Sequence, residues 1–199
     1  VVREDVPGSV SDILFTTDDN SWQAYTGWGG RSLYRYNSIG NRRSAKVSFD
    51  RPYDGGGYGR YNAHGAAQFV QWAESEGYEL EYAANADLHR DPDLLSHYAL
   101  YLSVGHDEYW SYEMREHVER FRDRGGNIAV FTANSIYWQV RFEESTRRMV
   151  CYKDSLTDPL YGIDDARVTV RWRDPPVNRP EAALIGVQYC STCCCDRGQ

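Results

Sequence analysis

The tripeptide His106-Asp107-Glu108 places an imidazole beside two carboxylates and is the sharpest polar constellation in the sequence. Histidine and carboxylate are metal ligands or general acid–base groups by type. If the backbone is extended here, His106 and Glu108 point to one side and Asp107 to the other, because side chains alternate along a strand. The tripeptide also precedes a predicted helix, where carboxylates interact favourably with the helix dipole, so a structural role stays open.

Tyrosine is a second source of ligands, with 16 residues in the chain. A phenol has a pKa of about 10, so it becomes an anionic ligand at neutral pH only beside a strong Lewis acid. Ferric iron is such an acid. The spacing of the 16 tyrosines does not select a pair of ligands by itself.

Other catalytic motifs are missing from the sequence. It contains no Gly-x-Ser-x-Gly elbow, no phosphate-binding P-loop and no His-Glu-x-x-His zinc motif. The glycine-rich stretch at 55–59 is interpreted as a flexible loop. Cys151 lies in a strand-like run and is interpreted as a small buried hydrophobe.

The elements that must position these groups alternate between strand and helix. A continuous apolar run at 98–104 predicts a central parallel strand, and His106 and Glu108 follow it directly. Asn134 follows the next predicted strand, 128–131, which we also expect to be buried. Ligands of such sheets bind beyond the carboxyl ends of the strands, so these three polar groups are expected on one functional edge.

The whole pattern predicts an α/β fold, a mostly parallel sheet with flanking helices, and a β-rich C-terminal part beyond residue 145. Residues 18–21 are interpreted as a polar loop, and residues 22–30 show no clear period. Further strands are predicted at 13–17, 45–49, 80–83, 149–152 and 168–172, and helices at 64–77, from 91 onward and between Ser111 and Gly125.

The composition limits the classes of partner that the protein can have. The chain has 199 residues, about one domain, and is 41% hydrophobic, enough for a core. Lys plus Arg is 22 and Asp plus Glu is 29, so the net charge is −7. An acidic balance argues against nucleic acid and anionic membranes as partners. No apolar run approaches the roughly 18 residues of a membrane span, and we expect a cytoplasmic protein.

Four of the five cysteines lie in the last ten residues, at 190 and 193–195. The spacing of the first two could serve zinc, but the tail offers no second pair of ligands. We therefore predict a domain over residues 1–189 and a foreign, cysteine-rich tail over 190–199, typical of a frameshifted end.

Several strings give the chain a family likeness. They are Trp22-Gln-Ala-Tyr25, Ser48-Phe-Asp-Arg51-Pro-Tyr53, Gly105-His106-Asp107-Glu108-Tyr109-Trp110-Ser111, and Asn134 followed by Tyr137-Trp138. In this order and spacing, from about Ser11 to Tyr189, the sequence resembles the catalytic domain of the large (beta) subunit of N,N-dimethylformamidase.

The resemblance implies a flavodoxin-like or class I glutamine amidotransferase-like sheet and a mononuclear, non-haem Fe³⁺ site. The family binds iron with two tyrosines and one glutamate. Carried onto this sequence, the metal ligands are Glu108, Tyr25 and Tyr53, with Tyr34 in reserve. His106 and Asn134 match the polar residues that surround the metal and take part in catalysis.

The implied reaction is hydrolysis of a small N-substituted amide, such as N,N-dimethylformamide, to formate and an amine. His106 would move the protons, and Asn134 would donate a hydrogen bond to the developing oxyanion. The resemblance is compatible with a homo-oligomer and with a small partner subunit. Because the likeness stops before the family's domain ends, the chain is expected to be truncated. The alternatives are a non-catalytic amidotransferase-like binding or structural domain, and a carbohydrate-active or adhesion domain with exposed tryptophans.

Overall fold

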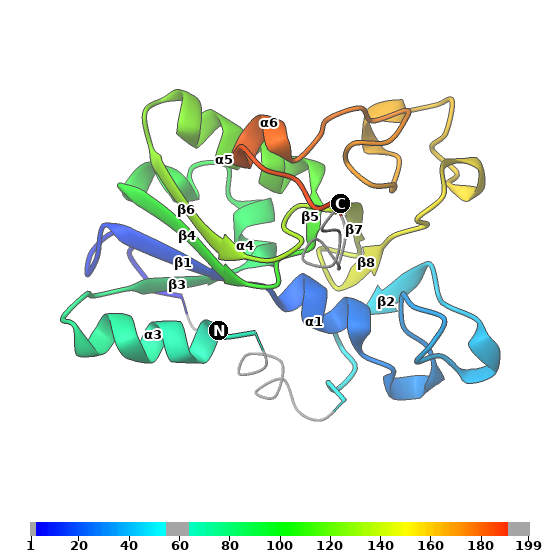
Figure 1. Ribbon diagram of the computed structural model, residues 1–199, viewed down its shortest axis with the longest axis horizontal. Coiled ribbons are helices and arrows are strands. Elements are labelled where there is room, and N and C mark those ends of the chain that lie inside the picture. The colour runs from blue at the N-terminus through cyan, green and yellow to red at the C-terminus, as the bar shows by residue number, and fades with distance from the viewer. Residues whose placement is uncertain (1–2, 55–63, 191–199) are drawn as a thin grey trace, which may run out of the picture.

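A parallel sheet of four strands, in the order β3-β1-β4-β6, forms one half of the molecule (Figure 1). The computed structural model describes residues 3–54 and 64–190. All neighbouring strands of this sheet pair in parallel, so their carboxyl ends meet at one edge. The strands are β1 (Ile13–Thr17), β3 (Glu81–Ala84), β4 (Leu100–Gly105) and β6 (Asn127–Thr132). The central position of β4 and the α/β fold are confirmed.

Helices cover both faces of this sheet. α3 (Ala66–Ser75) packs through Ala66 and Phe69 on the face that carries Leu102. α4 (Asn85–Arg90) and α5 (Tyr112–Asp123) pack on the opposite face, which carries Tyr101. The predicted start of α5 is confirmed, because the Met114 N–H donates to the Ser111 hydroxyl at 3.2 Å.

A second, mixed sheet of four strands in the order β2-β8-β7-β5 lies beside the first. β5 and β7 pair in parallel, and the other neighbours pair antiparallel. Its strands are β2 (Lys46–Ser48), β5 (Tyr109–Ser111), β7 (Trp138–Glu143) and β8 (Arg148–Val150). β4 therefore belongs to one sheet and β5 to the other, and residues 106–108 make the crossing between them.

The prediction of a β-rich C-terminal part is only partly confirmed. The stretch 168–172 forms no strand and contributes a single bridge, between Arg171 and Trp138. The Asp158 carboxylate accepts the Thr169 N–H at 2.8 Å, and this side-chain bond replaces a ladder bond. The remaining described elements of this part are short: η4 (Ser155–Thr157), η5 (Asp165–Arg167) and α6 (Ala182–Ile185).

Three further expectations were wrong. The predicted polar loop and the stretch without a clear hydrophobic period together include the helix α1 (Asp19–Tyr25). Its buried side includes the polar residues Asn20 and Gln23, so the helix has no apolar stripe that would reveal it in the sequence. The helix expected from 91 is only the 3₁₀ turn η3 (Leu94–His97). The strand at 128–131 is the edge strand β6, and its Phe131 is 61% exposed. Two more 3₁₀ turns follow α1, namely η1 (Trp28–Gly30) and η2 (Ile39–Asn41).

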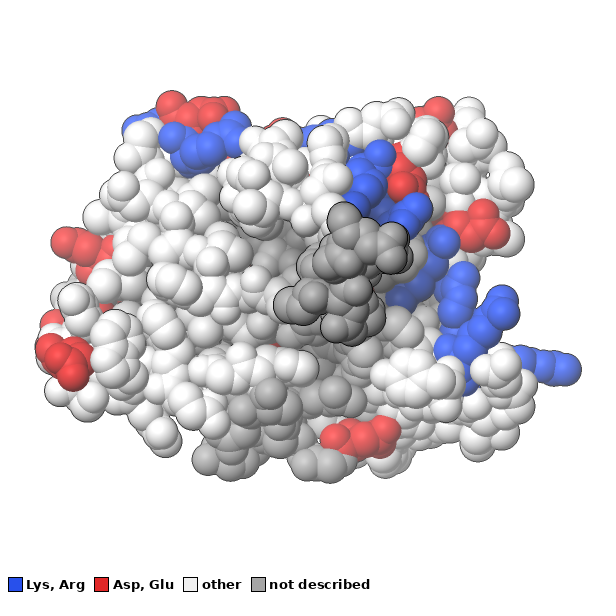
Figure 2. All heavy atoms as spheres, in the orientation of Figure 1, with Lys and Arg blue, Asp and Glu red and all other residues white. Residues whose placement is uncertain are grey.

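Charge is distributed unevenly over the surface. Figure 2 shows Lys and Arg side chains gathered over β2, β7 and β8, whereas the area over β4, β6 and α3 is nearly free of charge. None of the described helices is long and apolar enough to cross a membrane.

Candidate active site

Glu108 occupies the crossing between the two sheets, and α1 and the start of β7 hold its backbone. Its N–H donates to the Ser21 hydroxyl of α1 at 2.9 Å. Its carbonyl accepts the N–H groups of Tyr137 and Trp138, each at 2.9 Å. The residue is 2% exposed, so its carboxylate is presented to the protein interior from a fixed backbone.

Two phenols converge on this carboxylate. The Tyr25 hydroxyl donates to Oε2 of Glu108 at 2.8 Å, and the Tyr34 hydroxyl lies 3.0 Å from both carboxylate oxygens. The two rings are stacked, with centroids 4.3 Å apart. The structure thus brings together Tyr25 and Glu108, two of the predicted ligands, with Tyr34, the reserve tyrosine.

The loop after α1 fixes both tyrosines. Tyr25 is the last residue of α1, and Asn37 donates its side-chain amide to the Tyr25 carbonyl at 2.6 Å. Leu33 donates its N–H to the Ala24 carbonyl at 3.0 Å, which folds the loop back onto the helix and brings Tyr34 beside Tyr25. The convergence follows from hydrogen bonds within residues 24–38.

His106 lies next to the same carboxylate. Its Nε2 is 3.1 Å from Oε2 of Glu108 and 3.4 Å from the Tyr25 hydroxyl. Burial alone would lower the pKa of His106, but the hydrogen bond to Glu108 and the charge of Glu108 outweigh it and raise the pKa. Asp107 points to the other side of the chain, where Ser103 donates to it at 3.1 Å. The predicted alternation of the tripeptide is confirmed.

A lysine that no sequence motif singles out, Lys153, borders the site. Lys153 donates from Nζ to the Tyr109 hydroxyl at 2.7 Å, and Tyr109 donates to the Tyr34 hydroxyl at 2.5 Å. The ammonium also lies 3.6 Å from the centroid of the Tyr34 ring. Burial lowers the pKa of Lys153 to about 8. The available signal is compositional, since only Lys46 and Lys153 are lysines in a chain rich in arginine.

The other two predicted residues lie at the margin. The Tyr53 ring stands edge-on to Trp22, with centroids 6.2 Å apart, and no contact of Tyr53 with Glu108 is found among residues 3–54 and 64–190. Asn134 follows β6 in a left-handed conformation with φ of 56°. Its side-chain oxygen is buried and has no hydrogen-bond partner among the described residues.

The hydroxyls of Tyr25 and Tyr34 can serve a hard cation. Burial and the charge of Glu108 raise the pKa of both phenols, so without a cation both stay protonated and donate to the carboxylate. A trivalent ion would reverse this balance, because a bound cation stabilises the phenolates. Oxygens about 3 Å apart also suit adjacent ligands of one ion at metal–oxygen distances of about 2.0–2.2 Å. The residues present therefore fit a ferric ion.

Metal sites of the more common kind are not found in the described part of the chain, where no three His, Cys, Asp or Glu side chains group as ligands. A small hollow of about 10 Å³ lies beside His106, Tyr25 and Trp22. This volume corresponds to about one water molecule. The site thus combines two phenols, a carboxylate, an imidazole and room for a water.

Comparison with known proteins identifies the family. A family model described as N,N-dimethylformamidase beta subunit-like, C-terminal, matches residues 1–198. No match is found among curated proteins. The match covers nearly the whole chain, including α1, the crossing at 106–108 and β7. The chain therefore belongs to the N,N-dimethylformamidase beta subunit-like, C-terminal family.

Proposed function

We propose that the chain is the catalytic domain of an Fe³⁺-dependent amidohydrolase that cleaves small N-substituted amides such as N,N-dimethylformamide. The observation that carries the proposal is the approach of two phenol oxygens to within 3.0 Å of the buried Glu108 carboxylate. The family name supports the substrate class. The oxygen ligands suit a hard, highly charged ion, and phenolate is a ligand for ferric iron.

The ligand set that the geometry favours is Tyr25, Tyr34 and Glu108. Once deprotonated, the three groups carry three negative charges, which balance one ferric ion. Tyr53, which the resemblance selects, is the competing candidate for the second tyrosine, because its ring packs on Trp22 at the border of the same hollow.

The bound ion would supply Lewis acidity, which polarises an amide carbonyl and acidifies water. His106 accepts a proton from the attacking water and returns it to the departing amine nitrogen as the C–N bond breaks. Asn134 donates its amide N–H to the carbonyl oxygen as negative charge develops there. Lys153 and Tyr109 orient the Tyr34 oxygen through their hydrogen-bond chain, and the aromatic walls exclude bulk water.

Metal analysis and visible spectroscopy of the full chain test the site. We expect about one iron per chain and a tyrosinate-to-iron absorption band. Tyr34→Phe should weaken and shift the band, because Tyr25 is then the one tyrosine ligand left, and Tyr53→Phe should leave the band unchanged. Tyr161→Phe is the matched control, because this tyrosine is 47% exposed and lies outside the site. Release of dimethylamine from N,N-dimethylformamide is the activity assay.

The opposite results have definite meanings. A band that is unchanged in Tyr34→Phe and is weakened and shifted in Tyr53→Phe would transfer the ligand role to Tyr53. A folded sample that binds no iron and has no colour would overturn the proposal and favour a non-catalytic amidotransferase-like domain.

The sheet order supports the finer fold assignment that we propose. Counted within the parallel sheet, the order β3-β1-β4-β6 is 2-1-3-4. This is the beginning of the flavodoxin-like order 2-1-3-4-5, and ligands of such sheets bind where the order reverses, between the first and third strands. Here that position lies between β1 and β4, where α1 and the crossing at 106–108 begin. The family description also supports a partner subunit as a further proposal.

A further inference from the structure

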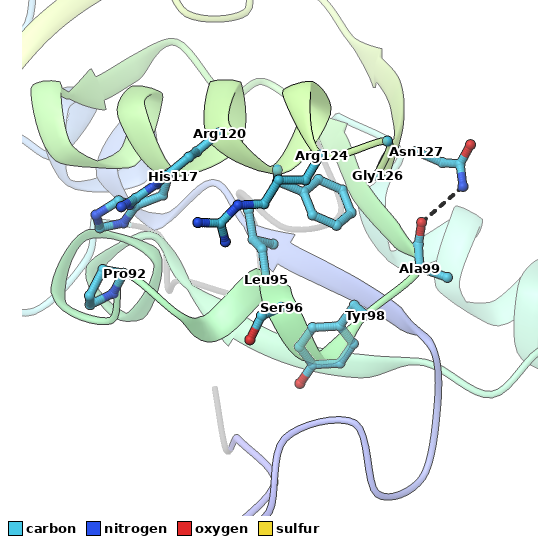
Figure 3. A pocket seen from close by; sticks show the side chains of 12 residues that line it. Pro92, Leu95, Ser96, Tyr98, Ala99, His117, Arg120, Arg124, Gly126 and Asn127 are labelled. Atoms are coloured by element: carbon cyan, nitrogen blue, oxygen red, sulfur yellow. Dashed lines mark hydrogen bonds between the residues drawn. The ribbon is translucent and has the colours of Figure 1, made fainter.

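We propose that a second site, at the end of the parallel sheet opposite to Glu108, binds a small organic anion that has a carboxylate or phosphate head and an apolar body. The site is a hollow of about 360 Å³ between the last turns of α5 and residues 92–99 (Figure 3). Figure 3 shows the Arg124 side chain reaching from the end of α5 across the hollow toward Leu95, with Arg120 beside His117.

The cationic wall of this hollow lacks anionic partners. Two other arginines of α5 pair with carboxylates, Arg115 with Glu119 at 2.7 Å and Arg122 with Asp123 at 2.7 Å. Arg120 and Arg124, in contrast, make no side-chain hydrogen bond or ion pair with any described residue. They are also the two that line the hollow.

Arg120 and Arg124 are four residues apart at the end of α5, and like charges at this spacing repel each other. Lys or Arg at the C-terminal end of a helix interacts favourably with the helix dipole. That interaction accounts for one arginine at the end of α5, but not for two unpaired arginines that line the same cavity. Arg120 and His117 also line a neighbouring hollow. Its acidic residues are Glu113, Glu116, Glu119 and Asp123, and none of them forms an ion pair with Arg120. An anion in the hollow would offset the repulsion and receive paired N–H donors from arginine.

His117 adds a third polar group to the wall. Its Nδ1 donates to the Leu88 carbonyl at 2.7 Å, which directs the ring and leaves Nε2 as the remaining polar atom. Burial, and secondarily the charge of Arg120, lowers the pKa of His117. The imidazole is therefore a reporter, because an anion bound beside it would change its environment.

The floor of the hollow is apolar and rigid. Leu95 and Phe121 are buried, and the Phe121 ring lies where a side chain on Gly126 would be, 2.4 Å from an ideal Cβ. Tyr98 presents its ring, because its hydroxyl is engaged by Glu81 at 2.5 Å. A ligand with an apolar body attached to its charged head would cover this floor, which a bare inorganic ion would leave uncovered.

The hollow is separate from the site at Glu108. It borders Ala99 and Asn127, at the amino ends of β4 and β6, whereas Glu108 follows the carboxyl end of β4. A strand of this length spans roughly 20 Å. The inference therefore does not depend on the proposed amidohydrolase activity.

Ligand binding by the full chain tests the inference. The probes are benzoate and phenyl phosphate, and inorganic phosphate and benzylamine serve for comparison. Binding of each is measured by calorimetry and by the change in the NMR signals of His117. We expect benzoate or phenyl phosphate to bind with a Kd below about 1 mM and to shift the His117 signals. The stronger of the two identifies the head group. Benzylamine, a cation with the same ring, should not bind.

Matched variants on one helix locate the binding. Arg120→Gln and Arg124→Gln should each weaken binding at least about tenfold, whereas Arg122→Gln should leave it unchanged. Thermal melting shows whether each variant is folded, and a folded Arg124→Gln that binds normally would overturn the inference. Failure of both aromatic anions to bind, or inorganic phosphate binding as tightly as phenyl phosphate, would also overturn it.

Discussion

Asp107 carries the sharpest expectation at the scale of single residues. The side chain is 1% exposed, and burial together with the charges of Asp18 and Asp19 raises its pKa to about 8. In the unfolded chain the same carboxyl has its ordinary pKa of about 3.8. Unfolding therefore releases a proton between these values, and the stability of the native protein should fall as pH rises from about 4 to about 8.

The variant Asp107→Asn removes this dependence. At pH 8 we expect the metal-free variant to be more stable than the native chain by about 5 kcal/mol, the cost of ionising a carboxyl whose pKa is raised from 3.8 to about 8, and near pH 4 the two should coincide. Urea unfolding of both proteins at a series of pH values measures the difference. Equal stability at pH 8 would mean that Asp107 ionises at an ordinary pH.

Which candidate side chains lie together could be predicted where one short string holds both of them. His106 and Glu108 share a face because they are two residues apart on an extended chain, and this is readable in the sequence. The approach of Tyr34 to Glu108 is not, because it depends on how the 24–38 loop returns to α1. Lys153 comes from beyond β8 and meets Tyr109 only after both sheets have assembled.

At the scale of elements, Glu81 joins the first described residues to β3. Its carboxylate accepts the N–H groups of Gly8 at 2.8 Å, Val10 at 2.7 Å and Ser11 at 3.1 Å. Burial opposes ionisation of Glu81, but these hydrogen bonds and that of Tyr98 outweigh it and lower the pKa. The side chain thus stabilises the native protein above pH 4.5, and this contribution is lost as pH falls below that value.

We expect Glu81→Gln to lower the free energy of unfolding by about 2 kcal/mol at pH 7 and by progressively less below pH 4.5. Glu79→Gln is the control, because Glu79 is an exposed neighbour. Chemical denaturation at pH 7 and pH 3 measures both variants. A loss that is the same at the two pH values would show that the charge of Glu81 is not involved.

The cap of α5 gives a second expectation for an element. The Ser111 hydroxyl accepts the Met114 N–H at 3.2 Å and lies 2.9 Å from Nδ1 of His89 on α4. Ser111→Ala should cost about 1 kcal/mol, the usual value for a lost N-cap. Ser75→Ala, at the exposed end of α3, is the comparison and should cost less than about 0.5 kcal/mol. Equal losses in the two variants would contradict a capping role.

Elements were predictable to the extent that their burial followed a simple period. α5 was found because Met114, Val118 and Phe121 repeat along one face beneath charged neighbours. α1 was missed because its buried side includes Asn20, Ser21 and Gln23, which a hydrophobic pattern does not register. The apolar run of β6 suggested a buried strand, yet its position at the edge leaves Phe131 exposed, and an edge depends on the whole sheet order.

At the scale of the whole molecule, the two sheets meet at the crossing between β4 and β5, so the candidate site depends on their relative placement. Long-range contacts from the C-terminal part hold this arrangement. The segment after β8 forms little regular structure of its own among the described residues, and side chains of α5 anchor it. Arg115 is the chief of these, since it is 1% exposed and lies 4.7 Å from the centroid of the Trp172 ring.

Arg115→Ala should therefore loosen the C-terminal segment before the parallel sheet. The guanidinium donates to the carbonyls of Arg179 and Pro180 while pairing with Glu119, and the variant leaves these buried acceptors unsatisfied. We expect a loss of about 3 kcal/mol and little recovery in Arg115→Lys, because an ammonium cannot reach both carbonyls in a fork. Arg124→Ala, which is exposed at the end of α5 and makes no side-chain hydrogen bond to this segment among the described residues, is the control. Hydrogen exchange should accelerate at 172–185 more than in β1, and equal acceleration in both would mean that the segment and the sheet unfold as one unit.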